Sequence, residues 1–203
     1  MGYLKLMFAL VLVCLIAFAP IAKESNATVI LNIDGDGQLL GAQNVDVGGV
    51  LYNVSFVENS CIAIFDGCDT IADFDFQTAS DATEAAEALL EQVLLDSVDG
   101  LFDSEPSLVN GITGSFSSHL MIPFALTDIR AFFRSAFNSN GSDVVGNGSF
   151  SVINNTNIDP TAVWVDFSLA PVGEPGAALL LATALAGLFV RRWRYRERRE
   201  APT

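Results

Sequence analysis

Cys61 and Cys68 are the side chains whose types and spacing most clearly predict a covalent link. The Asp66-Gly67 pair between them supplies a turn that can bring the two thiols together. A redox or zinc site would use a Cys-x-x-Cys spacing or a histidine partner, and neither accompanies this pair. We therefore expect a disulfide, which closes a short loop and is typical of an oxidising compartment.

A run of oxygen-bearing side chains resembles the first half of an EF-hand calcium loop, and it reads Asn32-x-Asp34-x-Asp36-Gly37. Position twelve of such a loop would be Gln43, where a bidentate glutamate is needed. The residues before the run also resemble a strand, whereas an EF-hand has a helix there. We therefore expect a turn and assign no metal ligands, while low-affinity calcium binding elsewhere on so acidic a surface stays open.

His119 is the only histidine, and this limits the catalytic arrangements that the chain can build. A Ser-His-Asp or Cys-His site would have to use it, yet no nucleophile elbow or cysteine partner accompanies it. Metal hydrolases generally collect several histidines. A glycosidase with two carboxylates needs none, and with this many acids that class stays open, although no pair stands out. The sequence favours a protein that is not an enzyme and has no cofactor.

The charge of the chain is concentrated in its middle. The whole chain carries a formal charge of −14, but residues 28–171 hold twenty acids against only Arg130 and Arg134, a net charge of −18. Both ends are apolar with basic flanks. An acidic body of this kind excludes a nucleic-acid binder, which needs a basic face to neutralise phosphates.

The first 27 residues have the organisation of a signal peptide. Lys5 and the amino terminus give a positive start, and residues 6–19 form an uninterrupted apolar run. Ser25 and Ala27 place small residues at the −3 and −1 positions, so we expect cleavage after Ala27. An uncleaved anchor is the alternative.

The C-terminal segment, residues 172–199, combines a short motif, an apolar stretch and a basic cluster. Residues 176–190 predict a transmembrane helix of about 22 Å, short for a bilayer core unless flanking arginines extend to the interface. The motif is Val172, Gly173, Glu174 and Pro175, and the cluster over 191–199 is Arg191, Arg192, Arg194, Arg196, Arg198 and Arg199. Positive residues stay on the cytoplasmic side, so the acidic body faces outward.

This order of elements resembles the PEP-CTERM sorting signal of Gram-negative bacteria. Glu174 and Pro175 match the family's defining pair, whereas Gly173 stands where the family usually has a proline. The resemblance implies recognition by an exosortase, a membrane-embedded cysteine transpeptidase that cleaves near the motif. It also implies a link to exopolysaccharide and biofilm formation, with the inner membrane as a transient partner and the mature form at the cell surface or outside the cell.

Three functional hypotheses follow from these features. The leading one is an exported, non-catalytic surface or extracellular-matrix protein. The others are a secreted glycan hydrolase with two carboxylates and a permanently membrane-anchored periplasmic protein.

The body, residues 28–171, is expected to be an α+β domain rich in antiparallel strands. Apolar runs and period-two alternation predict strands at 28–33, 50–57, 73–78, 148–153 and 162–169, the last with Trp164 opposite its main apolar face. Apolar residues at three- and four-residue spacing predict one amphipathic helix over 81–98, with Asp81 as its N-cap. The aromatic run at 130–137 fits either a helix or a strand.

Overall fold

The computed structural model describes residues 28–114, 116–140 and 142–171. The expected signal peptide (1–27) lies outside these ranges, as do the sorting motif (172–175), the transmembrane helix (176–190) and the arginine cluster (191–199). Among the described residues, no helix combines the length and apolar character needed to cross a membrane.

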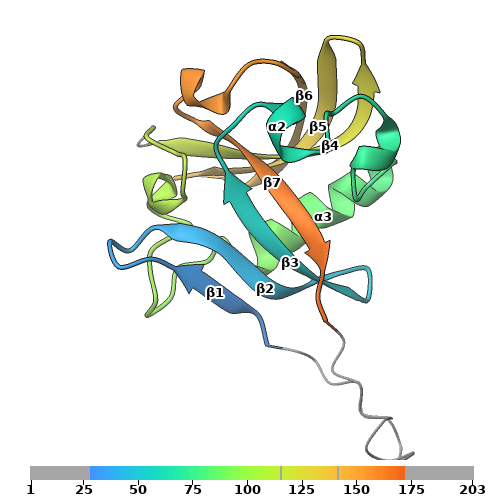
Figure 1. The fold of residues 1–203 in the computed structure, drawn as a ribbon. Coiled ribbons are helices and arrows are strands. Elements are labelled where there is room, and N and C mark those ends of the chain that lie inside the picture. Colours follow the sequence, from blue (N-terminus) through green and yellow to red (C-terminus); the bar gives the residue numbers. More distant parts are fainter. Residues whose placement is uncertain (1–27, 115, 141, 172–203) are drawn as a thin grey trace, which may run out of the picture. The chain divides into compact units, whose positions relative to one another are not determined.

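Seven strands form one mixed sheet with the order β1-β2-β3-β7-β4-β5-β6 (Figure 1). Their bounds are β1 (Ile30–Ile33), β2 (Leu39–Val47), β3 (Val50–Val57), β4 (Ser117–Thr127), β5 (Arg130–Ser139), β6 (Val144–Ser151) and β7 (Ala162–Leu169). Two antiparallel groups, β1 to β3 and β4 to β6, flank β7. β7 is the last described strand along the chain, and it lies between β3 and β4.

The α+β, strand-rich architecture confirms the expected fold class, but the expectation of an antiparallel sheet was too simple. β7 pairs with β4 in parallel, with His119 opposite Ala162 and Met121 opposite Trp164. β7 and β3, by contrast, run in opposite directions (Figure 1). The parallel pair arises because β7 returns to the middle of the sheet after the β4–β6 meander is complete.

The long helix α3 spans Ala79–Gln92, so the expected bounds of 81–98 were wrong at both ends. Its N-cap is Thr78, whose hydroxyl accepts a hydrogen bond from the Asp81 backbone N–H. Asp81 therefore lies in the first turn, where its charge favours the positive end of the helix dipole. Val93 and Leu94 remain buried beyond the last helical turn, which explains why the apolar pattern extends past the helix.

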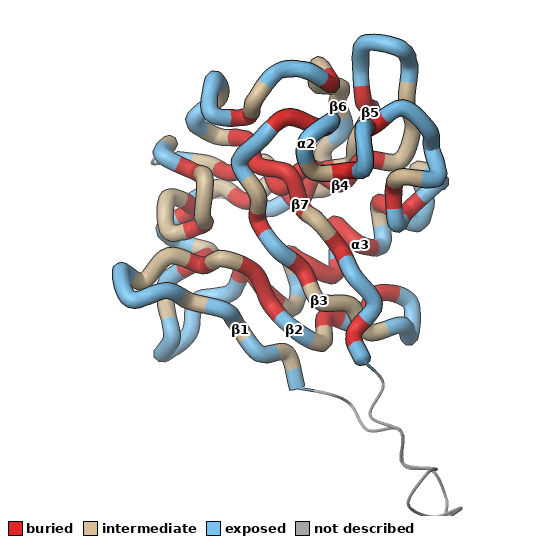
Figure 2. Tube along the Cα trace, viewed as in Figure 1, coloured by how far each residue is buried: buried red, intermediate tan, exposed pale blue. Residues whose placement is uncertain are grey.

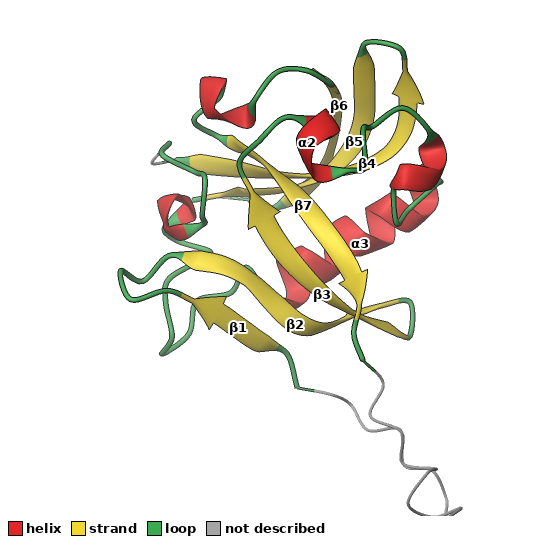
Figure 3. Ribbon diagram, in the orientation of Figure 1, coloured by secondary structure: helices red, strands yellow, loops and turns green. Residues whose placement is uncertain are grey.

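Four short helices complete the described elements (Figure 3). They are α2 (Cys61–Ile64), η1 (Ile71–Asp73), η2 (Pro106–Leu108) and η3 (Thr156–Ile158). The strand expected at 73–78 is absent, and that stretch is the end of η1 followed by an extended loop. The aromatic run that fitted two alternatives is strand β5.

Each face of the sheet packs against its own core, and most of β7 is buried between the two cores (Figure 2). Val163, Val165 and Phe167 face the helix-side core, which also contains the buried face of α3. Trp164 faces the opposite core, which we call the disulfide-side core. That second core contains Cys61, Phe65, Cys68, Phe74, Met121, Ala131, Val152, Ala162 and Trp164. A strand that is apolar on both faces is thus explained by burial on both sides.

Candidate functional site

The disulfide between Cys61 and Cys68 is present, as the spacing predicts, with Cα atoms 5.7 Å apart. Asp66, Gly67 and Cys68 all have positive φ, so the loop between the sulfurs turns tightly. Both cysteines are buried in the disulfide-side core, where the neighbouring Phe65 ring meets Trp164 edge to face at 5.8 Å. The bridge therefore fixes the segment that covers this face of the sheet.

The stretch that resembles a calcium loop is the tight turn between β1 and β2. The Asp34 carboxylate accepts hydrogen bonds from the backbone N–H groups of Asp36 and Gln38, both at 2.9 Å. This is the ordinary use of an aspartate in a turn. Nowhere in the described ranges do three or more metal-ligating residues converge on a point that could hold an ion.

His119 lies half-buried on β4, and its surroundings do not form a catalytic triad. Its Nδ1 atom is 3.5 Å from the hydroxyl of Ser135, and its ring packs on Phe137 with centroids 4.5 Å apart. Ser135 is 1% exposed, so a substrate cannot reach its hydroxyl. Burial lowers the pKa of His119, and the charge of Asp159 opposes this only in part. The side chain is best described as a neutral histidine that packs against the sheet.

Asp75 and Asp166 are a pair of acids that the sequence did not single out, and the charge of Asp166 acts on the Asp75 carboxyl. Asp75 lies on the loop before α3, and Asp166 lies on β7. Desolvation, together with the charge of Asp166, raises the pKa of Asp75 to about 6, although the residue remains exposed at the surface. Burial also raises the pKa of Asp166. No local pattern could reveal the pair, because its members meet only through the fold.

A second acidic feature is a polar surface cavity of about 330 Å³. It is lined by Asp103, Ser104, Ser139, Asn140, Ser142 and Asp143. Burial raises the pKa of Asp103, and the charges of Asp143 and Asp96 add to this effect. Asp96 lies beside the cavity, and a hydrogen bond from the Ser104 hydroxyl is the main cause that lowers its pKa. The backbone N–H groups of Ser104 and Asp103, both at 3.0 Å, add to this effect.

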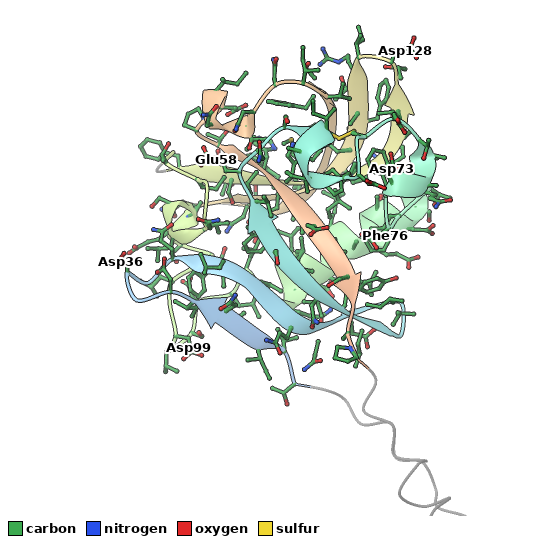
Figure 4. All side chains as sticks on the ribbon, viewed as in Figure 1. Asp36, Glu58, Asp73, Phe76, Asp99 and Asp128 are labelled. Atoms are coloured by element: carbon green, nitrogen blue, oxygen red, sulfur yellow. A yellow bond between two sulfur atoms is a disulfide. The ribbon has the colours of Figure 1, made fainter. Side chains whose placement is uncertain are left out.

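The remaining acids are dispersed over the surface of the body. Asp36, Asp73, Asp99 and Asp128 lie at separate places in Figure 4. The high negative charge therefore does not come from one acidic patch. Among the described residues, the carboxyls whose pKa is raised are those of Asp75, Asp166 and Asp103.

Comparison with known proteins gives no family for this chain. It matches no protein-family model, no curated protein and no solved structure.

Proposed function

We propose that this chain is the precursor of an exported, non-catalytic surface or matrix protein that an exosortase sorts and processes. The observation that carries the proposal is the order of elements at the C-terminus. Glu174-Pro175 is followed by the apolar stretch 176–190 and then by six arginines within residues 191–199. A simple anchor needs the apolar stretch and the positive charges, but it has no need of the Glu-Pro pair.

In this proposal the three parts of the C-terminal segment have separate roles. Glu174 and Pro175 are what the exosortase recognises, residues 176–190 stop transfer in the inner membrane, and the arginines keep the end of the chain in the cytoplasm. The acidic body is thereby delivered to the outer side of the membrane. Release or transfer of the body after cleavage would place it at the cell surface or in an exopolysaccharide matrix.

Two features of the described body support export. The Cys61–Cys68 disulfide suits an oxidising compartment, because cytosolic thiols are normally kept reduced. The last strand, β7, ends at Leu169, only a few residues before Val172. The body and the sorting motif are therefore directly adjacent along the chain.

The sorting proposal is tested by the intact mass of the mature protein from its host. We expect loss of the residues before Thr28 and of the apolar tail that follows the Glu-Pro pair. The double variant Glu174→Ala/Pro175→Ala should retain its tail, whereas Glu200→Ala, beyond the arginine cluster, should be processed normally. A mature, exported protein that still ends at Thr203 would contradict sorting and favour a permanent anchor.

A glycan hydrolase with two carboxylates is the second candidate, and the Asp75–Asp166 pair is the observation that favours it. A carboxyl with a pKa near 6 can hold a proton for a leaving group while a second carboxylate acts as base or nucleophile. If this pair is an active site, the protein should cleave a polysaccharide. Asp75→Asn and Asp166→Asn should each abolish that cleavage. Asp99→Asn, on an exposed loop, is the matched control. Cleavage that survives both substitutions would remove this pair as the site.

A further inference from the structure

Strand β6 forms one edge of the sheet, so one row of its backbone groups faces away from β5. The backbone N–H of Val152 donates to the carbonyl of Ile129 at 3.2 Å, which makes residues 129 and 152 a hydrogen-bonded pair. The register from Arg130 to Phe137 is unbroken, and antiparallel pairs alternate between bonded and non-bonded. The outward-facing residues are therefore Val145, Asn147, Ser149 and Ser151.

The composition of β6 offers little protection against pairing with another chain. Its eight residues, VVGNGSFS, contain no charged side chain and no proline. Edge strands usually carry such residues, because an open row of N–H and C=O groups is a template for another strand. The opposite edge, β1, has only four residues and therefore offers a much shorter template.

Arg130 of β5 reaches across this unprotected strand. Its Nε donates to the Ser149 hydroxyl at 2.8 Å, and its Nη2 donates to the Ser149 carbonyl at 2.7 Å. Ser149 pairs with Phe132, which is a non-bonded pair, so this carbonyl belongs to the outward row. The guanidinium thus occupies an acceptor that an added strand would need.

We propose that Arg130 closes the β6 edge against a second copy of this chain. Two β6 strands that pair antiparallel around Asn147 would place Val145 of each copy opposite Ser149 of the other. The backbone N–H and C=O groups that face away from β5 in one copy would then face those of the other copy. Such a contact is self-complementary and closes as a twofold dimer. Because β6 carries no charged side chain, pairing of two β6 strands would not place like charges opposite each other within the strand pair. Arg130 occupies the Ser149 carbonyl in both copies and so opposes this pairing.

The test uses the full chain in its own export compartment and a cysteine at the centre of the edge. In a twofold β6 pair, residue 147 of each copy would be about 5.5 Å from its counterpart between Cα atoms, within disulfide range. We expect Arg130→Ala/Asn147→Cys to give a several-fold higher fraction of disulfide-linked dimer on a non-reducing gel than Asn147→Cys alone. Net charge alone predicts the opposite, because removal of Arg130 makes the body more negative.

Two controls separate edge closure from other causes. Arg134→Ala/Asn147→Cys removes the other arginine of β5, which has no bond to the β6 backbone, and should remain at the level of Asn147→Cys. Arg130→Ala/Glu87→Cys places the thiol on the exposed face of α3 and should not cross-link. Far-UV circular dichroism and an intact Cys61–Cys68 bridge establish folding. Equal dimer from the Arg130 and Arg134 variants, or no increase in a folded Arg130 variant, would overturn the proposal.

Discussion

The rings of Phe76 and Phe167 meet edge to face, with centroids 4.9 Å apart. Tyr52 of β3 contacts both rings, at 5.5 and 5.8 Å. The residues directly before the two phenylalanines are Asp75 and Asp166. The aromatic contact therefore fixes two acids near each other on a body that already has a large negative charge.

This arrangement predicts that Asp75 contributes more to the stability of the body in mild acid than at neutral pH. Since the pKa of Asp75 is raised from 3.8 to about 6 on folding, the folded state keeps a proton that the unfolded chain has lost. The contribution of Asp75 to the free energy of unfolding therefore falls as pH rises from about 4 to about 6, and then levels. Asp75→Asn should stabilise the protein at pH 7.5 by up to about 1 kcal/mol, because solvent screens this exposed group.

Urea denaturation at pH 4 and pH 7.5 measures the effect of Asp75→Asn. The stabilisation should appear at pH 7.5 and be nearly absent at pH 4, where the wild-type carboxyl is protonated in the folded state. Asp99→Asn should not reproduce this difference. Destabilisation at pH 7.5, or an equal effect at both pH values, would show that ionised Asp75 does not disfavour the fold.

Loss of the disulfide should loosen one face of the sheet. Cys61→Ala/Cys68→Ala should lower the free energy of unfolding by about 2–3 kcal/mol, the chain-entropy value for so short a loop. Because Phe65, between the two cysteines, packs on Trp164, the emission of that tryptophan should shift to the red. The chain has one other tryptophan, so the measurement uses a Trp193→Phe background. Unchanged emission after loss of the bridge would contradict its role in covering Trp164.

Trp164 is fully buried, yet its indole N–H has no hydrogen-bond partner within the described ranges. Trp164→Phe should therefore cost less than about 1 kcal/mol, because the lost packing is offset by removal of an unsatisfied donor. Trp164→Ala leaves a large cavity and should cost about 3–5 kcal/mol. Thermal unfolding of the two variants tests this contrast. Equal destabilisation would indicate that the N–H is satisfied in solution, for instance by a buried water.

Gly41 is required where β2 passes β3 closely. A Cβ atom at this position would lie 2.0 Å from the backbone carbonyl oxygen of Val54, which cannot move without breaking the strand pair. Gly41→Ala should therefore cost about 3 kcal/mol or more. Gly35→Ala in the β1–β2 turn meets nothing within 4 Å and should change the denaturation midpoint little. A midpoint for Gly41→Ala close to that of Gly35→Ala would contradict the close approach.

Strands with regular alternation were predictable from the sequence. The predicted ranges 50–57 and 162–169 coincide with β3 and β7. β2 escaped prediction because its register shifts between Ala42 and Val45, where Asn44 has φ 60°. The bulge moves its apolar residues out of period two. β4 was not predicted either, because it contains Pro123, which normally argues against a central strand. The strand tolerates this proline because β4 pairs with β7 only over His119–Met121, before the proline.

The strand expected at 73–78 was wrong because its two phenylalanines enter different cores. Phe74 is buried in the disulfide-side core, whereas Phe76 is buried in the helix-side core. Residues two apart in a strand would share a face. A loop that passes the end of the sheet can instead bury them on opposite sides, and only the tertiary structure reveals this difference.

The candidate site was less predictable than the fold. The disulfide could be inferred from two cysteines seven positions apart, since both partners lie in one local turn. Asp75 and Asp166, or Arg130 and Ser149, come together through strand order and register. A single sequence carries no local pattern for either contact, so neither could be anticipated.

The strand directions have a consequence for how the ends of the body can be rearranged. β1 begins and β7 ends toward the same end of the sheet (Figure 1), separated by two intervening strands. At about 4.8 Å per strand the two ends are about 14 Å apart, a gap that a linker of roughly five residues spans. The body can thus be joined into a circle and reopened at the β4–β5 turn near Asp128. Such a permutant would move the attachment point of residues 172–203 from the end of β7 to the β4–β5 turn without changing the strand order.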